Sequence, residues 1–323
     1  MKLKSFFTFS LIAVMAIGLI GCKSSNTPKT SADSNLRLKF NAGEVYTITS
    51  TIDQDIAQEV PEQPIKFHQT IQMGLNCLVK SVDADGNYNL DVTYQSLMYK
   101  ITGLVQPIDF DSKAADNKEF PLAGLVGQTY QVTLAPNGKV LDVQGADQIV
   151  DRLVDDIQAQ VPAEVKSVLS KDALKYQFGD KATQEMMANV ICAFPDHRVE
   201  NGDHWQQEFA LKYGYPVKIN TEYTLEKSNA QVATIDVKAS RTPLADAPAM
   251  TVGNISFSYE LNGQDTGKIE VDAKTGWINN ATINSKLTGK VIIAPTEDLP
   301  EGLTWPITVN GVVALKGEGP LSQ

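Results

Sequence analysis

The chain has 323 residues, of which 42% are hydrophobic and 20% are charged, so a wholly disordered or collagen-like protein is excluded. Acidic residues outnumber Lys and Arg by 38 to 28, and the sequence contains no basic cluster. An acidic surface repels phosphate backbones, so we expect no nucleic-acid partner. The one long apolar run lies at the extreme N-terminus, which excludes a protein with several membrane-spanning helices.

The N-terminus has the pattern of a bacterial lipoprotein precursor. Lys2 and Lys4 precede an apolar stretch at residues 6–20 that is too short to span a bilayer comfortably. It ends at Gly21-Cys22, and an apolar residue followed by a small residue and Cys resembles the lipobox, in which the Cys receives a diacylglyceryl group. We therefore predict a lipoprotein signal peptide at residues 1–21 and membrane anchoring through acyl chains on Cys22. The alternative is an ordinary secretory signal with an incidental Cys.

The segment after the lipobox bears on location. Residues 22–35 are polar, rich in Ser and Thr, and without apolar periodicity, which predicts a flexible tether. Lys23 follows the Cys, and Lys at that position resembles the outer-membrane sorting pattern, whereas an acidic cluster used for surface export is not found there. We expect a lipid-anchored protein of the cell envelope, attached to the outer membrane and facing the periplasm.

Alternation of apolar and polar residues dominates the chain from residue 36 onward. It predicts antiparallel strands that are buried on one face and wet on the other. The runs at residues 67–79 and 281–293 exceed ten residues, which is typical of a strongly curved sheet or barrel. We therefore expect a mainly β fold of long curved antiparallel sheets, shaped like a half-barrel or a lipoprotein carrier. Turn signals for hairpins stand at Asp85-Gly86, Asn137-Gly138, Asn262-Gly263 and Lys274-Thr275-Gly276.

The middle of the chain changes to helical spacing, with apolar residues three and four apart through residues 146–193. Pro162 is expected to begin a second helix and Gly179 to separate a third. Residues 36–323 are then one β-rich body made of a first β-unit (36–145), a helical insert (146–193) and a second β-unit (194–323). Short segments recur in both units, and a decayed duplication and chance similarity both remain open.

The order of these features resembles an uncharacterised family of bacterial lipoproteins, the domain-of-unknown-function family numbered 6263. The resemblance spans about residues 36–316 and implies a fold and an envelope location, because its motifs are turns and strands and the family has no known activity. The segments on which it rests are Ser81–Tyr88, Val126–Tyr130, Pro136–Val140, Phe194–Asp196, Asn201–Trp205, Thr266–Val271 and Thr275–Trp277.

Metal-binding patterns are weak. His197 and His204 lie seven residues apart in a polar loop, without the fixed ligand spacing of a zinc site, so we interpret them as surface residues and expect no metal. The segment from Asp83 to Asn87 invites a calcium interpretation. The sixth and twelfth positions of such a loop hold Tyr88 and Tyr94 instead of Gly and Glu, so a hairpin turn is favoured.

The sequence contains no nucleophile elbow, phosphate-binding loop or dinucleotide fingerprint. Carboxylates are plentiful and scattered, and a catalytic pair could still be assembled from them in three dimensions. We expect no enzyme, no catalytic residue and no cofactor.

Two cysteines remain in the body. Cys77 is in register with the buried face of its strand, and Cys192 follows a helical stretch. Outside the cytoplasm they could form a disulfide that closes the insert onto the first sheet. Two separate buried thiols are the equal alternative.

The expected function is the binding of a hydrophobic ligand or a partner protein by an envelope lipoprotein. A large concave apolar face has only a short helical segment to fill it. Trp205, Trp277 and Trp305 would serve as core filling or as lining of a ligand pocket. A structural or accessory subunit of an envelope complex and an envelope hydrolase are the alternatives.

Overall fold

A computed structural model describes residues 35–114, 120–160, 171–213, 216–244, 249–252, 255–297 and 299–321. The predicted signal peptide, Cys22 and residues 22–34 of the predicted tether lie outside the described residues, as does the helix expected to begin at Pro162. No helix in the described part of the chain is long and apolar enough to cross a membrane.

The first half of the chain forms the strands β1 (Val45–Gln58), β2 (Ile65–Val82), β3 (Tyr88–Thr102), β4 (Ile108–Asp111), β5 (Thr129–Leu134) and β6 (Val140–Gln144), with a 3-10 turn η1 (Pro121–Leu125). The helices α2 (Ala146–Gln160), α4 (Lys171–Phe178) and α5 (Asp180–Val190) follow. The second half forms β7 (His204–Leu211), β8 (Val217–Ser228), β9 (Val232–Pro243), β10 (Met250–Val252), β11 (Ile255–Asp272), β12 (Ile278–Ile293) and β13 (Leu303–Leu321).

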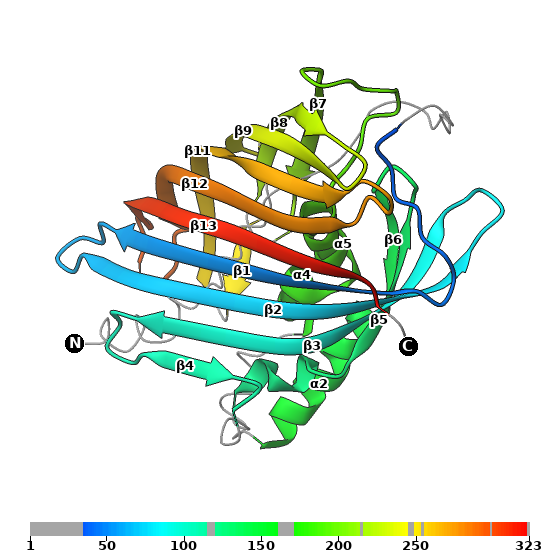
Figure 1. The fold of residues 1–323 in the computed structure, drawn as a ribbon. Coiled ribbons are helices and arrows are strands. Elements are labelled where there is room, and N and C mark those ends of the chain that lie inside the picture. The colour runs from blue at the N-terminus through cyan, green and yellow to red at the C-terminus, as the bar shows by residue number, and fades with distance from the viewer. Residues whose placement is uncertain are drawn as a thin grey trace.

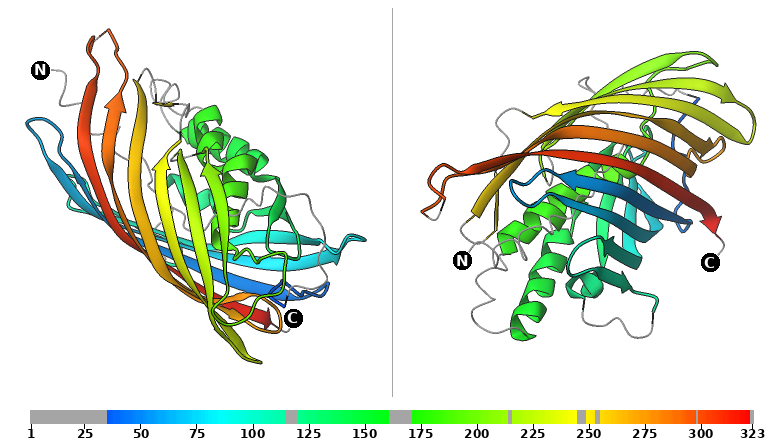
Figure 2. Two further views of the ribbon diagram at one scale, coloured as in Figure 1. Left: turned by 90° about the horizontal axis from the view of Figure 1, so that it is seen from above. Right: turned by 90° about the vertical axis from the view of Figure 1, so that its left-hand side faces the viewer.

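The thirteen strands of the described residues join in one antiparallel sheet in the order β6-β5-β3-β2-β1-β13-β12-β11-β9-β8-β7, with β4 on β3 and β10 on β11. The first and last long strands pair in the middle of the sheet, so the two halves of the chain form one continuous surface (Figure 1). The sheet curves, and the helices lie on its concave side (Figure 2). The prediction of a mainly β fold with long curved antiparallel strands is confirmed.

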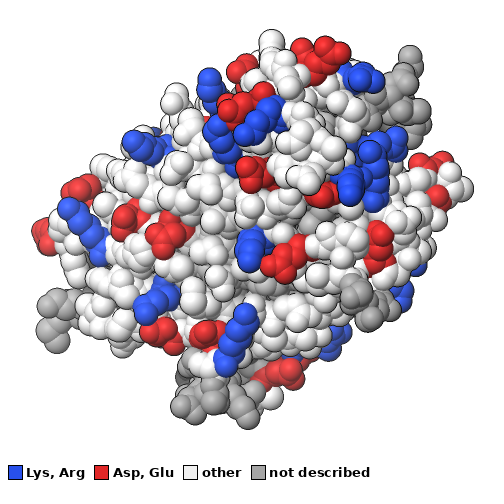
Figure 3. Space-filling model, in the orientation of Figure 1, with Lys and Arg blue, Asp and Glu red and all other residues white. Residues whose placement is uncertain are grey.

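The alternation in the sequence fixes which face each strand buries. In β1, Tyr46, Ile48 and Ile56 are at most 2% exposed and face the core, whereas the residues between them are more exposed. Because directly paired residues of an antiparallel ladder share a face, the inward set of β1 continues across the neighbouring strands. The outward set forms the convex face, over which acidic and basic side chains are interspersed (Figure 3).

Three of the four predicted hairpin turns are confirmed. Gly86, Gly138 and Gly276 have φ values of 82°, 83° and 73°, which suits glycine in a tight turn. The turn predicted at Asn262-Gly263 is wrong, because β11 runs unbroken through both residues. Glycine is needed there for another reason: a Cβ at Gly263 would collide with the backbone of Leu287 on β12.

The helical insert is held by a pair of aspartates. Asp180 Oδ1 accepts hydrogen bonds from the backbone N–H groups of Ala146 (2.7 Å) and Asp147 (3.1 Å) at the start of α2. Asp147 Oδ1 in turn accepts one from the N–H of Asp180 (2.8 Å) at the start of α5. Gly179 precedes α5 at its N-cap, as predicted. Each helix therefore caps the N-terminus of the other, which fixes their relative placement.

Candidate functional site

A cavity of about 1130 Å³ opens on the inner face of β7, β8, β9 and β11. Four residue triplets form its floor, centred on Gln207, Thr221, Ala239 and Asp265. Opposite the floor lie the segment Ala193–His197, which follows α5, and two residues at the β5–β6 turn, Asn137 and Lys139. We call this space the inner cavity.

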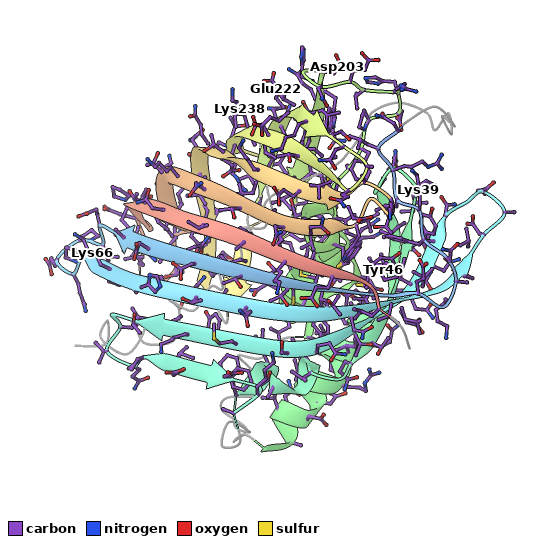
Figure 4. All side chains as sticks on the ribbon, viewed as in Figure 1. Lys39, Tyr46, Lys66, Asp203, Glu222 and Lys238 are labelled. Atoms are coloured by element: carbon purple, nitrogen blue, oxygen red, sulfur yellow. The ribbon has the colours of Figure 1, made fainter. Side chains whose placement is uncertain are left out.

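The register explains why these four residues lie together. Gln207 pairs with Thr221, Thr221 with Ala239, and Ala239 with Asp265, so one side chain from each of four adjacent strands faces the inner cavity. Glu222 and Lys238 belong to the same triplets and also pair with each other, but their side chains alternate with those of Thr221 and Ala239. They project from the opposite face of β8 and β9 (Figure 4).

The floor belongs to a longer row of inward positions, most of which hold polar residues. From Asp265 the ladder continues to Ser285, through Gly311, to Gln54 and Gln69. Ser285, Gln54 and Gln69 are at most 3% exposed, and Gln69 Nε2 donates to Gln54 Oε1 across 3.4 Å. We call this set, from Gln207 to Gln69, the polar row. It crosses an inner face that is mostly apolar, although Ser50 and Gln58 of β1 are also buried there.

An ion pair anchors the polar row at the inner cavity. Arg241 Nε donates to Asp265 Oδ2 across 2.6 Å, and the two side chains are 1% and 2% exposed. Gly263, opposite Arg241 on β11, presents no side chain at that point. A buried guanidinium keeps its charge, so it requires a carboxylate partner.

Three residues of the cavity lining each bear a buried polar atom with no hydrogen-bond partner among the described residues: Trp205 Nε1, Thr221 Oγ1 and Asp265 Oδ1. The residues that bear them are 6%, 2% and 2% exposed. Buried polar groups in folded proteins are nearly always paired, since leaving one unpaired costs about 1–3 kcal/mol. Such atoms also occur outside the lining, on Tyr99, Asn189 and Thr234 for example, and all of them are shielded from solvent.

Hydrogen bonds hold the wall segment Ala193–His197, which we call the covering segment, in place on the sheet. The N–H of Phe194 donates to the carbonyl of Asn137 (2.9 Å), and Asn137 Nδ2 donates to Asp196 Oδ1 (2.9 Å). Two residues beyond His197, Val199 is held by Asn35, whose side chain bonds both the N–H and the carbonyl of Val199. The apolar part of the wall includes Phe194 and, from β7, Phe209.

The structure places the residues singled out from the sequence in different environments. Trp277 and Trp305 are core residues, whereas Trp205 lines the inner cavity and stacks on Tyr223 at 5.4 Å. His197 lines the cavity and His204 is exposed at the start of β7. The described residues hold no group of three or more side chains suited to a metal ion. Asp83 bonds the backbone of Asp85 and Asn87, so the segment interpreted as a hairpin turn is one.

Cys77 and Cys192 are both free and buried in the structure. Burial in apolar surroundings raises the pKa of each thiol to about 12. Both thiols are therefore protonated at neutral pH, a state in which cysteine is a poor nucleophile.

Sequence reasoning missed Thr221, Arg241 and Asp265. A signal was present in β9, where Ala233, Ile235 and Val237 set an inward apolar register that Arg241 interrupts. A charged residue at an inward position indicates either a buried pair or a functional site.

No curated protein matches the chain. Among solved structures, lipovitellin, studied for its lipid–protein interactions, is similar at a TM-score of 0.44 and 10% identity over 88% of this chain. This chain spans about a quarter (26%) of the lipovitellin chain. An outer membrane channel from Pseudomonas putida F1 is similar at a TM-score of 0.25 and 5% identity, over 91% of this chain and 100% of that one. The model of a family of unknown function, DUF6263, matches residues 85–278, more than half of the sequence, and the chain therefore belongs to the DUF6263 family.

Proposed function

We propose that this protein is a non-enzymatic binding protein of the cell envelope that holds an amphipathic molecule in the inner cavity. The observation that supports this most is a cavity of about 1130 Å³ on the inner face of the sheet, lined by both apolar and polar residues. Pockets that bury small organic ligands are of this order, about 300–1,000 Å³, with mostly apolar walls and a few placed polar groups.

The composition of the lining favours a ligand with one apolar and one polar part. Phe194 and Phe209 offer apolar surface, while Thr221 and Asp265 offer polar atoms on the floor. Asp265 is already joined to Arg241, an arrangement that suits holding a ligand better than transferring a proton.

Anchoring at Cys22 would keep this cavity close to a membrane. Asn35 fastens the chain to Val199, which lies two residues beyond the cavity wall at His197. Asn35 is thirteen positions beyond Cys22, and at full extension that length of chain reaches at most about 45 Å. A lipid-anchored chain would therefore present the inner cavity within reach of the bilayer that supplies amphipathic molecules.

The test is native mass spectrometry of the purified full chain carrying Cys22→Ser, before and after challenge with a lipid extract. We expect one bound lipid per chain. Ala239→Leu, which adds bulk to the cavity floor between Thr221 and Asp265, is expected to abolish it.

The matched control is Ala314→Leu, the same change on the convex face of β13, where Ala314 pairs with Thr51. Bound lipid should persist in this variant. Absence of lipid from the Cys22→Ser chain, or equal binding by the Ala239→Leu chain, would contradict the proposal.

A further inference from the structure

The sheet has two edges, and the helical insert covers them unequally. The path of paired strands ends at β6 on one side and at β7 on the other (Figure 1). An edge strand directs main-chain N–H and C=O groups away from its sheet, and folded proteins generally cover or pair such groups. On β6, the carbonyl of Leu141 accepts a hydrogen bond from Gln184 Nε2 of α5 (3.0 Å). The next residue of α5, Glu185, reaches the other edge of the sheet.

The insert covers the edge of β7 beyond the last residue of that strand. Glu185 Oε2 accepts from the backbone N–H of Lys212 (2.9 Å), and the hydroxyl of Tyr176 on α4 donates to the carbonyl of Lys212 (2.6 Å). Both main-chain groups of Lys212 therefore point away from β8 and toward the insert.

The same orientation recurs at every second residue within β7. Opposite the start of the strand, the N–H of Leu225 on β8 donates to the carbonyl of Asp203 (2.9 Å). Main-chain groups of an antiparallel pair alternate along each strand, so the odd-numbered residues of β7 bond β8 and the even-numbered ones face outward, as Lys212 does. Among the described residues, the outward-facing groups of residues 206, 208 and 210 have no partner outside the β7–β8 ladder. We call this stretch, Gln206–Ala210, the open edge.

The open edge borders the inner cavity. Residues 205–210 all line the cavity, and the covering segment lies across it. Because the space between them is bounded on both sides, it suits a single extended chain better than the edge of another sheet. Phe209 and Phe194 offer apolar surface within the cavity, whereas Gln206 and Glu208 are exposed on the other face of β7. A chain paired with the open edge would direct every second side chain into the cavity.

Glu208 determines which charge this added chain should carry. It is the only acidic residue of β7, and β7 contains no Lys or Arg. Its ion pair with Lys218 on β8 (2.8 Å) is exposed, and exposed pairs contribute little to stability. A second cation directly opposite Glu208 on an added strand would therefore be favourable.

We infer that β7 binds a segment of a partner protein by strand addition at the open edge. The segment is extended and antiparallel to β7, as β8 is. Its apolar side chains enter the inner cavity, and its polar side chains, with a lysine opposite Glu208, lie on the other face. The inference goes beyond the proposed function, since it concerns a protein partner, and such a segment would compete with a lipid for the inner cavity.

The test uses the full Cys22→Ser chain and a fluorescein-labelled peptide, Lys-Val-Thr-Val-Lys-Val-Thr, whose binding is followed by fluorescence anisotropy. Directly paired residues share a face, so the polar residues of the peptide direct their N–H groups to the open edge and the valines direct theirs away from it. Methylating the amide nitrogens of the internal threonine and the internal lysine should weaken binding at least about tenfold. Methylating those of two valines, the matched control, should leave the affinity nearly unchanged.

A pair of substitutions tests the same contact from the side of the protein. Glu208→Pro removes an N–H that β8 does not use, and proline is tolerated at such an edge position. This variant should bind the peptide at least about tenfold more weakly. Glu208→Ala, the matched control, keeps the N–H and should lose only the smaller contribution of the exposed charge. Circular dichroism melting curves establish that each variant is folded.

The outcomes separate this inference from the proposed function. Equal affinity of the two methylated peptides, equal affinity of the two Glu208 variants, or no binding of the parent peptide overturns strand addition. A dimer in size-exclusion chromatography that Glu208→Pro converts to a monomer also overturns it, because a second copy of the chain then fills the open edge. If the Cys22→Ser chain holds a lipid and no peptide, the proposed function alone stands. If it holds the peptide and takes up no lipid, strand addition alone stands.

Discussion

Thr221 shows how one residue can reduce stability while serving a site. Its hydroxyl is buried on the cavity floor with no partner among the described residues, so the empty protein bears the cost of desolvating it. We predict that Thr221→Val, which is nearly isosteric, stabilises the ligand-free chain by about 1 kcal/mol and raises its Tm by roughly 2–4 °C. Differential scanning calorimetry of delipidated protein measures this. A lower Tm would show that the hydroxyl already has a partner.

The ionisation of His68 on the convex face depends on two neighbouring aspartates. One ring nitrogen lies 3.0 Å from Asp55 Oδ1 and the other 3.3 Å from Asp53 Oδ2. The hydrogen bond to Asp55, aided by the charge of Asp53, raises the pKa of His68 above 6.5. The protonated form therefore favours the fold: its contribution is complete below pH 6.5 and is lost as the pH rises through the raised pKa.

The measurement for His68 is an NMR titration of the imidazole. We predict a pKa above 6.5 in the parent chain and a lower value in Asp55→Asn, which keeps the shape of the side chain and removes its charge. The three side chains are 39% to 79% exposed, so the effect on overall stability is small. The same pKa in both chains would contradict this account.

At the scale of elements, the reciprocal caps of α2 and α5 hold the insert in place beside the covering segment. Asp180→Ala removes the acceptor of two N–H groups at the start of α2. We predict a loss of about 1–2 kcal/mol in the free energy of unfolding, measured by urea denaturation. Asp172→Ala, an exposed first-turn aspartate of α4, is the control and should cost less. Equal losses would show that the caps contribute nothing specific.

Most elements of the fold could be predicted because one face of each strand is buried. The inward residues of β1 and β3 can be recognised because apolar residues recur at every second position. The turns that join the strands of a hairpin can be recognised by short motifs that end in glycine. The prediction at Gly263 failed because the same Asn-Gly pair also occurs where two strands approach too closely for a side chain. The reciprocal caps join residues 33 apart, beyond any local capping pattern.

The candidate site could not be predicted from the sequence, because it depends on register. Gln207, Thr221 and Asp265 come from three different strands, and none stands in a recognisable motif. Only the ladder brings them into one row, and a shift of one residue in any strand would turn its member to the convex face. The lone local sign was Arg241, charged at an inward position of β9.

At the scale of the whole molecule, one curved sheet joins the first and last long strands and encloses the inner cavity beside the insert. The proposed anchor at Cys22 places that cavity near a membrane. We predict that radiolabelled palmitate is incorporated into the parent chain in growing cells and not into Cys22→Ser. Cys77→Ser, which changes a buried thiol of the body, should retain the label. Labelling of the Cys22→Ser chain would contradict the anchor.

The most direct test of the central claim uses Trp205 as a reporter of the inner cavity and the other two tryptophans as internal controls. The indole N–H of Trp277 donates to the carbonyl of Thr47 (3.1 Å) and that of Trp305 to Gln58 Oε1 (2.8 Å), whereas that of Trp205 has no partner among the described residues. In a proton–nitrogen NMR spectrum of deuterated Cys22→Ser protein, adding the lipid extract should move the indole signal of Trp205, which lines the inner cavity, and leave the other two in place. A bound lipid that leaves the Trp205 signal unmoved would contradict binding in the inner cavity.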